Sequence, residues 1–145
     1  MKLFAIFCFS LGLFPLQVNG QGQTMTVIVL GVKNSSGMVR VGLSNSEKEF
    51  TMIMWQTRSS MSVSTQAKAG EVQAVFENIG YGTYAISVVH DTNENGKMDS
   101  NAVGIPKEGF GFSNNARGIF GPPSFEETKF VWEGQKKIEI ILKYY

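Results

Sequence analysis

The segment EVQAVFENIGYGTYAISVVH, residues 71–90, carries the clearest structural pattern of the chain. Apolar residues occupy every second position on either side of the turn-forming GYG at 80–82: Val72, Ala74 and Phe76, then Tyr84, Ile86 and Val88. An alternation of period two places these side chains on one face of a β-strand, toward a core. Residues 71–78 and 83–90 are therefore predicted strands.

Further strand patterns precede this segment. Residues 24–32 are apolar on both faces, which predicts a central strand or a strand whose ends are covered. Residues 38–43 are expected to form the next strand. The turn-forming sequence at 34–37 predicts that these two strands make a hairpin. Residues 50–55 are expected to form a short strand, and the Ser/Thr-rich stretch after Arg58 a loop or an edge strand.

The C-terminal part supplies one more predicted pair of strands. Residues 129–132 and 136–143 are expected to pair around Gly134, with Ile138, Ile140 and Leu142 pointing inward. No segment shows a sustained helical period, and no internal repeat is visible. The predicted fold class is all-β, an antiparallel β-sandwich formed by one domain over residues 21–145.

Residues 1–20 have the composition of a secretory signal peptide. A positive start at Lys2 precedes an apolar run over 3–16, and the small residue Gly20 ends the segment. The run is too short for a membrane anchor, which needs roughly 20 apolar residues. We expect cleavage near Gly20, export to the periplasm or the extracellular space, and no membrane span afterwards. Cys8, the only cysteine, lies in this run, so the rest of the chain offers neither a disulfide nor a thiolate metal site.

The charge balance restricts the class of partner. Outside residues 1–20 the chain carries 12 basic and 12 acidic residues, because Lys2 is the only charged residue of that segment. A neutral balance without basic runs gives no electrostatic reason to expect nucleic acid as a partner. A small molecule, a glycan or an envelope protein remains as the expected partner.

Residues 91–125 show no strand or helix period. Loops longer than about 12–15 residues are uncommon in compact domains unless they are functional or disordered. Aromatic rings are costly to leave in water, and four of them argue against disorder here: Phe110, Phe112, Phe120 and Phe125. We therefore expect one long ordered loop that contains the functional site.

Within it, residues 91–99, DTNENGKMD, place oxygen atoms at alternate positions. Calcium takes about six to eight hard oxygen ligands, which a tight loop supplies from spaced side chains and a carbonyl. Gly96 allows the sharp turn. The predicted calcium ligands are the side chains of Asp91, Asn93, Asn95 and Asp99 and the backbone carbonyl of Lys97.

This motif differs from an EF-hand and has a simpler alternative. Ala102 stands where an EF-hand has its closing glutamate, so the missing ligands would come from water, Glu94 or Glu108. Asp, Asn and Gly also form ordinary turns, because their side chains bond to their own backbone and tolerate left-handed conformations. A structural turn without a cation would use the same residues.

Two further groups of residues have both a functional and a structural interpretation. His90, the only histidine, could act with Asp91 and Glu108 as the site of a hydrolase or isomerase, or it could anchor the loop by a hydrogen bond. GFGF at 109–112 and NN at 114–115 could present aromatic faces and amides to a ligand. The phenylalanines could instead close the open end of the sandwich.

Several stretches match a known pattern: FENIGYGTYAI at 76–86, HD at 90–91 with the following loop, GIPKEGFGFSNN at 104–115 and GPPSF at 121–125. Together they resemble the DUF2141 family of exported bacterial proteins. The resemblance implies a transthyretin- or carboxypeptidase-regulatory-like β-sandwich, an immunoglobulin/transthyretin-like class. It brings no settled activity with it.

The sequence thus favours an exported, non-enzymatic binding or structural module with a calcium-type cation loop. The alternative is a hydrolase or isomerase whose site lies around His90, Asp91 and Glu108.

Overall fold

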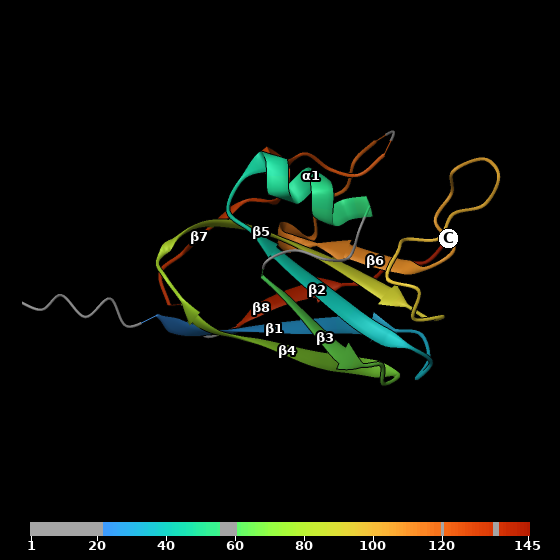
Figure 1. Ribbon diagram of the computed structural model, residues 1–145, viewed down its shortest axis with the longest axis horizontal. Coiled ribbons are helices and arrows are strands. Elements are labelled where there is room, and N and C mark those ends of the chain that lie inside the picture. Colours follow the sequence, from blue (N-terminus) through green and yellow to red (C-terminus); the bar gives the residue numbers. More distant parts are fainter. Residues whose placement is uncertain (1–21, 56–60, 120, 135–136) are drawn as a thin grey trace, which may run out of the picture.

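The computed structural model describes residues 22–55, 61–119, 121–134 and 137–145, so the predicted signal peptide lies outside the described residues. Two β-sheets face each other (Figure 1), with strand orders β4-β1-β8 and β3-β2-β5-β6, and β7 is added to β5. The strands are β1 Gln23–Val32, β2 Met38–Ser44, β3 Ser62–Gln66, β4 Gly70–Ile79, β5 Gly82–Asp91, β6 Gly109–Phe112, β7 Phe130–Trp132 and β8 Ile138–Ile141. The fold is thus an all-β sandwich, and its finer likeness to immunoglobulin or transthyretin domains stays a prediction.

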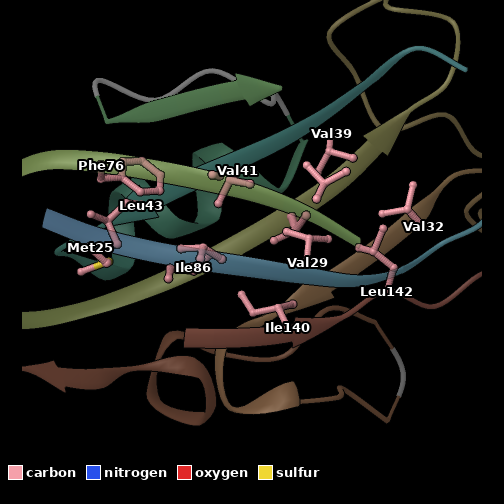
Figure 2. Close-up of a cluster of buried hydrophobic side chains, with 14 of the residues drawn as sticks. Met25, Val29, Val32, Val39, Val41, Leu43, Phe76, Ile86, Ile140 and Leu142 are labelled. Carbon is pink, nitrogen blue, oxygen red and sulfur yellow. The ribbon is translucent and has the colours of Figure 1, made fainter. Parts of the chain in front are cut away.

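The core lies between the two sheets (Figure 2) and follows the predicted alternation. Val72, Ala74 and Phe76 of β4 are buried, and so are Ile86 and Val88 of β5. Burying a side chain of this size stabilises the fold by about 1.5–3 kcal/mol relative to leaving it exposed. Strand β1 lies between β4 and β8, which confirms the predicted central strand.

The predicted hairpin of β1 and β2 is wrong, because these strands belong to different sheets. Residues 34–37 carry the chain from one sheet across to the other. Gly37 has a φ of 69°, and a Cβ atom there would overlap the backbone of Asp91 and Thr92. The apolar pattern of a strand tells which face is buried, but it does not tell which sheet the strand joins.

The predicted pairing around Gly134 is also wrong. Strand β7 pairs antiparallel with β5, whereas β8 pairs parallel with β1 and makes the one parallel pair among the strand pairings described. Ile140 is buried and Ile138 partly buried, so the inward face of β8 was predicted correctly. Strand β3 pairs with β2 alone and lies at the edge of its sheet, which agrees with one of the two expectations for this stretch.

A helix, α1 over Glu47–Trp55, replaces the strand predicted at 50–55. Ser46 precedes it, and the Ser46 side chain accepts the backbone N–H of Glu49 at 3.4 Å. Phe50 is buried in a second apolar cluster on the outer face of the β2-β5 sheet. That cluster contains Phe50, Ala85 and Phe112, with Phe110 and Phe125 packed against it. No helix in the described part of the chain is long and apolar enough to cross a membrane.

Strand β6 interrupts the loop predicted over residues 91–125. It pairs antiparallel with β5, and its inward positions are glycines. A Cβ atom on Gly109 would overlap the Tyr144 ring, and one on Gly111 would lie 2.7 Å from Ile140. The strand is only four residues long, and its alternating apolar residues, Phe110 and Phe112, belong to the cluster on the outer face, so no inward apolar pattern marks it. A short helix, α2 over Phe125–Thr128, follows with Ser124 as its cap.

Candidate functional site

The 91–99 loop begins at Asp91, the last residue of β5, whose carboxylate is fully buried. Its Oδ1 atom accepts the backbone N–H of Asn95 at 3.1 Å. Its Oδ2 atom accepts the N–H of Gly96 at 2.9 Å and the Nε–H of Arg40 at 2.5 Å. The antiparallel register of β2 and β5 places Arg40 and Asp91 on the same face of the sheet. Asp91 thus folds the loop back on itself, and Arg40 balances its charge.

The side chains of Asn93, Asn95 and Asp99 converge. The Nδ2 atom of Asn93 donates to Asp99 Oδ2 at 2.6 Å, and that of Asn95 donates to both Asp99 oxygens, at 3.1 and 3.0 Å. The amide oxygens close local turns: Asn93 Oδ1 accepts the Asn95 N–H, and Asn95 Oδ1 accepts the Lys97 N–H. The structure therefore brings together Asn93, Asn95 and Asp99, which are three of the predicted ligands. It places Lys97 in the same turn.

This arrangement is a satisfied network of hydrogen bonds, which is what the structural-turn interpretation requires. It also keeps the oxygen atoms that a hard cation requires, because each amide oxygen has a second lone pair beside the one used by the backbone N–H. A cation would have to displace the Nδ2 groups from Asp99. Within the described residues, no group of three or more His, Cys, Asp or Glu side chains is arranged to hold a metal ion.

Glu108 lies under the loop and joins its two ends. It is 3% exposed; Oε1 accepts the backbone N–H of Thr92 at 2.9 Å, and Oε2 accepts that of Asp99 at 3.1 Å. Burial raises the pKa of the Glu108 carboxyl, the charges of Asp91 and Asp99 raise it further, and the two backbone hydrogen bonds lower it. Glu108, which the sequence offered as a source of a missing calcium ligand, thus binds the backbone at both ends of the loop.

His90 is fully buried, with both ring nitrogens hydrogen-bonded. Its Nε2 atom lies 2.8 Å from the carbonyl oxygen of Ser36, and Nδ1 lies 2.7 Å from the hydroxyl of Tyr144. Because a carbonyl only accepts, Nε2 carries the proton and Nδ1 accepts from Tyr144. The Tyr144 hydroxyl in turn accepts the backbone N–H of Lys33 at 3.0 Å. His90 therefore anchors the C-terminal segment and the 34–37 turn, as its simpler interpretation predicted.

The geometry gives no support to the predicted hydrolase or isomerase site. His90 and Asp91 are neighbours on β5, so their side chains point to opposite faces of the sheet. The carboxylate of Glu108 is occupied by backbone N–H groups.

The residues of GFGF and the following asparagines are used inside the fold. Phe112 packs edge-to-face on Phe50 with a ring-centre distance of 6.0 Å. This contact agrees with the structural interpretation of the phenylalanines, in which they pack inside the fold. Asn114 donates through Nδ2 to two carbonyls of residues 127 and 129, and Asn115 accepts the backbone N–H of Ile141 through Oδ1. Phe110 differs from Phe112, because it is only half-buried.

Residues 100–106 form a small lobe beyond the 91–99 loop, shown in gold in Figure 1. Asn101 organises it: its Oδ1 atom accepts the backbone N–H groups of Val103 at 3.0 Å and Ile105 at 2.9 Å. The side chains of these two residues are left exposed, 78% and 46% respectively.

An apolar groove of about 590 Å³ runs between this lobe, β6 and the segment after it. Its lining is Met98, Ser100, Val103, Gly104, Ile105, Pro106, Phe110, Phe112, Gly118, Ile119, Gly121, Pro122 and Tyr145. Ile119 and Tyr145, which are 26 residues apart in the sequence, are about 89% and 77% exposed. Such a gathering of exposed apolar side chains is typical of surfaces that bind a ligand or a partner.

A smaller hollow, the basic cleft, of about 70 Å³, adjoins the groove. Its lining is Phe110, Gly111, Phe112, Asn115, Ala116, Arg117, Gly118, Gly121, Pro123, Ile141, Lys143 and Tyr145. Five residues line both hollows: Phe110, Phe112, Gly118, Gly121 and Tyr145.

Sequence reasoning missed the groove and the Arg40–Asp91 pair. The only sign of the groove in the sequence is a set of apolar residues without strand or helix period, Val103, Ile105 and Ile119. Their convergence with the C-terminal Tyr145 depends on the pairing of residue 110 with residue 143.

Searches of curated proteins and of solved structures gave no match. One family model matches residues 27–140, the family described as uncharacterized protein conserved in bacteria (DUF2141). This match covers most of the chain, including most of both sheets, the 91–99 loop and the lining of both hollows apart from Ile141, Lys143 and Tyr145. It confirms the resemblance noted in the sequence. The chain therefore belongs to the DUF2141 family.

Proposed function

We propose that this chain is an exported, non-enzymatic binding module that holds a ligand in the apolar groove and takes a calcium-type cation in the 91–99 loop. The observation that carries the proposal is the groove itself, whose exposed apolar side chains come from segments distant in the sequence. Its volume of about 590 Å³ lies in the range of small-molecule sites.

The cation loop and the groove are physically continuous. Met98 and Ser100, on either side of Asp99, line the groove. The Asp99 carbonyl accepts the backbone N–H of Lys107 at 2.8 Å, which closes the base of the 100–106 lobe. A cation held by Asp99 would therefore stiffen the wall of the groove, and binding at one place would favour binding at the other.

A non-catalytic role is supported by the state of the titratable groups. His90 is buried and hydrogen-bonded on both sides of its ring, and Glu108 and Asp91 bind backbone N–H groups.

Export is supported by the pattern of residues 1–20 alone. The N-terminal residue of the protein recovered from the cell envelope or the medium tests it, and a start near Gln21 is expected.

Calcium binding is tested by calorimetric titration and thermal melting of chelator-treated protein. Extracellular calcium modules have dissociation constants of about 0.1–1 mM, and tenfold excess ion stabilises such a site by about 1.4 kcal/mol. A melting shift of about 5 °C is expected at several millimolar calcium. Asp99→Asn should remove the shift, and Glu139→Gln, which removes the same charge from an exposed position of β8, should keep it.

The groove is tested separately with N-phenyl-1-naphthylamine, a neutral apolar dye that fluoresces in apolar surroundings. Binding that is weakened by Ile119→Ser supports the groove. If calcium gives neither heat nor a melting shift, the proposed cation site is wrong. If the dye does not bind, the proposed role of the groove is wrong.

A further inference from the structure

We infer that the ligand of the apolar groove is an anionic amphiphile of the fatty-acid type, with its alkyl chain in the groove and its carboxylate in the basic cleft. This inference rests on the proposed function, because it names the ligand class for the same groove.

The composition of the groove selects an apolar body. Of its lining residues only Ser100 and Tyr145 have a side-chain hydroxyl, and none carries a charge. A glycan needs several hydrogen-bonding partners for its hydroxyls, and desolvating them without partners costs binding energy. An alkyl chain needs none, and gains from covering the exposed surfaces of Val103, Ile119 and Tyr145.

The composition of the basic cleft selects an anionic head. Arg117 and Lys143 line it, and no Asp or Glu does. Both salt bridges found among the described residues lie elsewhere, and neither involves Arg117 or Lys143. The Nδ2 group of Asn115 makes no hydrogen bond in the described part of the chain, where only the Oδ1 atom is used. Two cations and a free amide donor at one place are complementary to a carboxylate.

The two hollows meet, so one molecule can occupy both. The rings of Phe110 and Tyr145 stack at 5.8 Å and line both spaces. Gly118 and Gly121 also line both, and a Cβ atom on Gly118 would overlap the backbone of Gly121. Gly118 and Gly121 thus approach each other closely, and neither adds a side chain where the two hollows meet. The apolar groove thus leads to the cations of Arg117 and Lys143. A carboxylate with a single alkyl chain is complementary to this arrangement.

The experiment measures displacement of N-phenyl-1-naphthylamine from the exported protein by three twelve-carbon amphiphiles that differ in the head group. Dodecanoate is anionic, dodecan-1-ol neutral and dodecyltrimethylammonium cationic. Dodecanoate should displace the dye at a concentration at least about tenfold lower than the other two, since one hydrogen bond between charged groups contributes about that factor.

Matched variants assign the preference to the cleft. The double variant Arg117→Gln, Lys143→Gln should lose about tenfold in dodecanoate affinity and keep its affinity for dodecan-1-ol. The double variant Lys68→Gln, Lys137→Gln changes the net charge equally at exposed positions outside both hollows and should behave as the unmodified protein.

The possible failures are distinguishable. If the dye does not bind, the groove of the proposed function fails. If the dye binds but the three amphiphiles displace it equally, or the cationic one displaces it best, the anionic ligand class is overturned and the groove stands. Equal losses in both double variants overturn the assignment of the head group to the basic cleft.

Discussion

Arg40 and Asp91 form an ion pair across two neighbouring strands, with Arg40 Nε 2.5 Å from Asp91 Oδ2 and the Asp91 side chain wholly buried. The other hydrogen bonds of the Asp91 carboxylate come from backbone N–H groups of the 91–99 loop. The pair therefore joins the β2-β5 ladder to the loop, and Arg40 is part of the candidate site although it lies 51 residues away in the sequence.

Removing Arg40 should destabilise the protein strongly. Arg40→Gln leaves the Asp91 carboxylate buried without its cation, and the expected loss is about 3 kcal/mol in the free energy of unfolding, measured by urea denaturation. Arg117→Gln removes an exposed arginine and should change stability by less than about 0.5 kcal/mol. Adding Asp91→Asn to Arg40→Gln should restore part of the loss, and two independent, additive losses would contradict the pairing.

Glu108 should give the protein a pH dependence of defined sign. Burial raises the pKa of the Glu108 carboxyl in the folded state, so the folded protein retains this proton at a pH where the unfolded chain has lost it. Its contribution to stability is present below its usual pKa of 4.5 and is lost as the pH rises through the folded-state pKa. The free energy of unfolding should therefore decline over this window by at most about 1.4 kcal/mol per pH unit. In Glu108→Gln this decline should be absent.

Glu127 provides the control for this sign. Hydrogen bonds from the backbone and the side chain of Ser124 lower the pKa of the Glu127 carboxyl. Its contribution is therefore present above the usual pKa of 4.5 and is lost as the pH falls through the lowered value. We compare the urea midpoints of Glu108→Gln and Glu127→Gln with that of the unmodified protein between pH 3 and 8. The difference from the unmodified protein should change with pH in opposite directions for the two variants. The same direction for both would contradict the assignment.

Loss of the Tyr144 hydroxyl should destabilise the C-terminal segment. Tyr144→Phe leaves Nδ1 of His90 and the N–H of Lys33 without their partner, and an unsatisfied buried polar group costs about 1–3 kcal/mol. Thermal melting measures this loss. Tyr145→Phe removes a hydroxyl from a residue that is 77% exposed, and it should leave the melting temperature nearly unchanged. Equal effects of the two substitutions would mean that the His90 contact contributes nothing.

A methyl group on β6 should disturb the packing of the chain end. In Gly109→Ala the new Cβ atom meets the Tyr144 ring, so the ring or the strand must move, at a cost of about 1–3 kcal/mol. Gly80→Ala is the matched control, because a Cβ atom there has no neighbour within 4 Å. Comparable melting temperatures for both variants would show that Tyr144 does not pack against β6.

The strands that alternate clearly were predictable, whereas two elements were not. Val72, Ala74 and Phe76 reach the core as their spacing predicts, because a strand must place every second residue on the same face. The strand β6 has only four residues, with glycines at its inward positions and its phenylalanines on the outer face, so no inward apolar pattern revealed it. At residues 50–55 an apolar run is compatible with either a strand or a helix, and the packing of Phe50 on the outer face of the sheet favours the helix.

The sequence by itself determined which faces of the strands are buried and that residues 91–99 form a tight, oxygen-rich turn, because both properties depend on residues close together in the chain. Only the tertiary structure decided which sheet each strand joins, that Arg40 lies beside Asp91 and Tyr144 beside His90, and that Ile119, Val103 and Tyr145 line one groove. These relationships bring together residues far apart in the chain. They are set by the packing of whole strands and loops, and no local pattern encodes that packing.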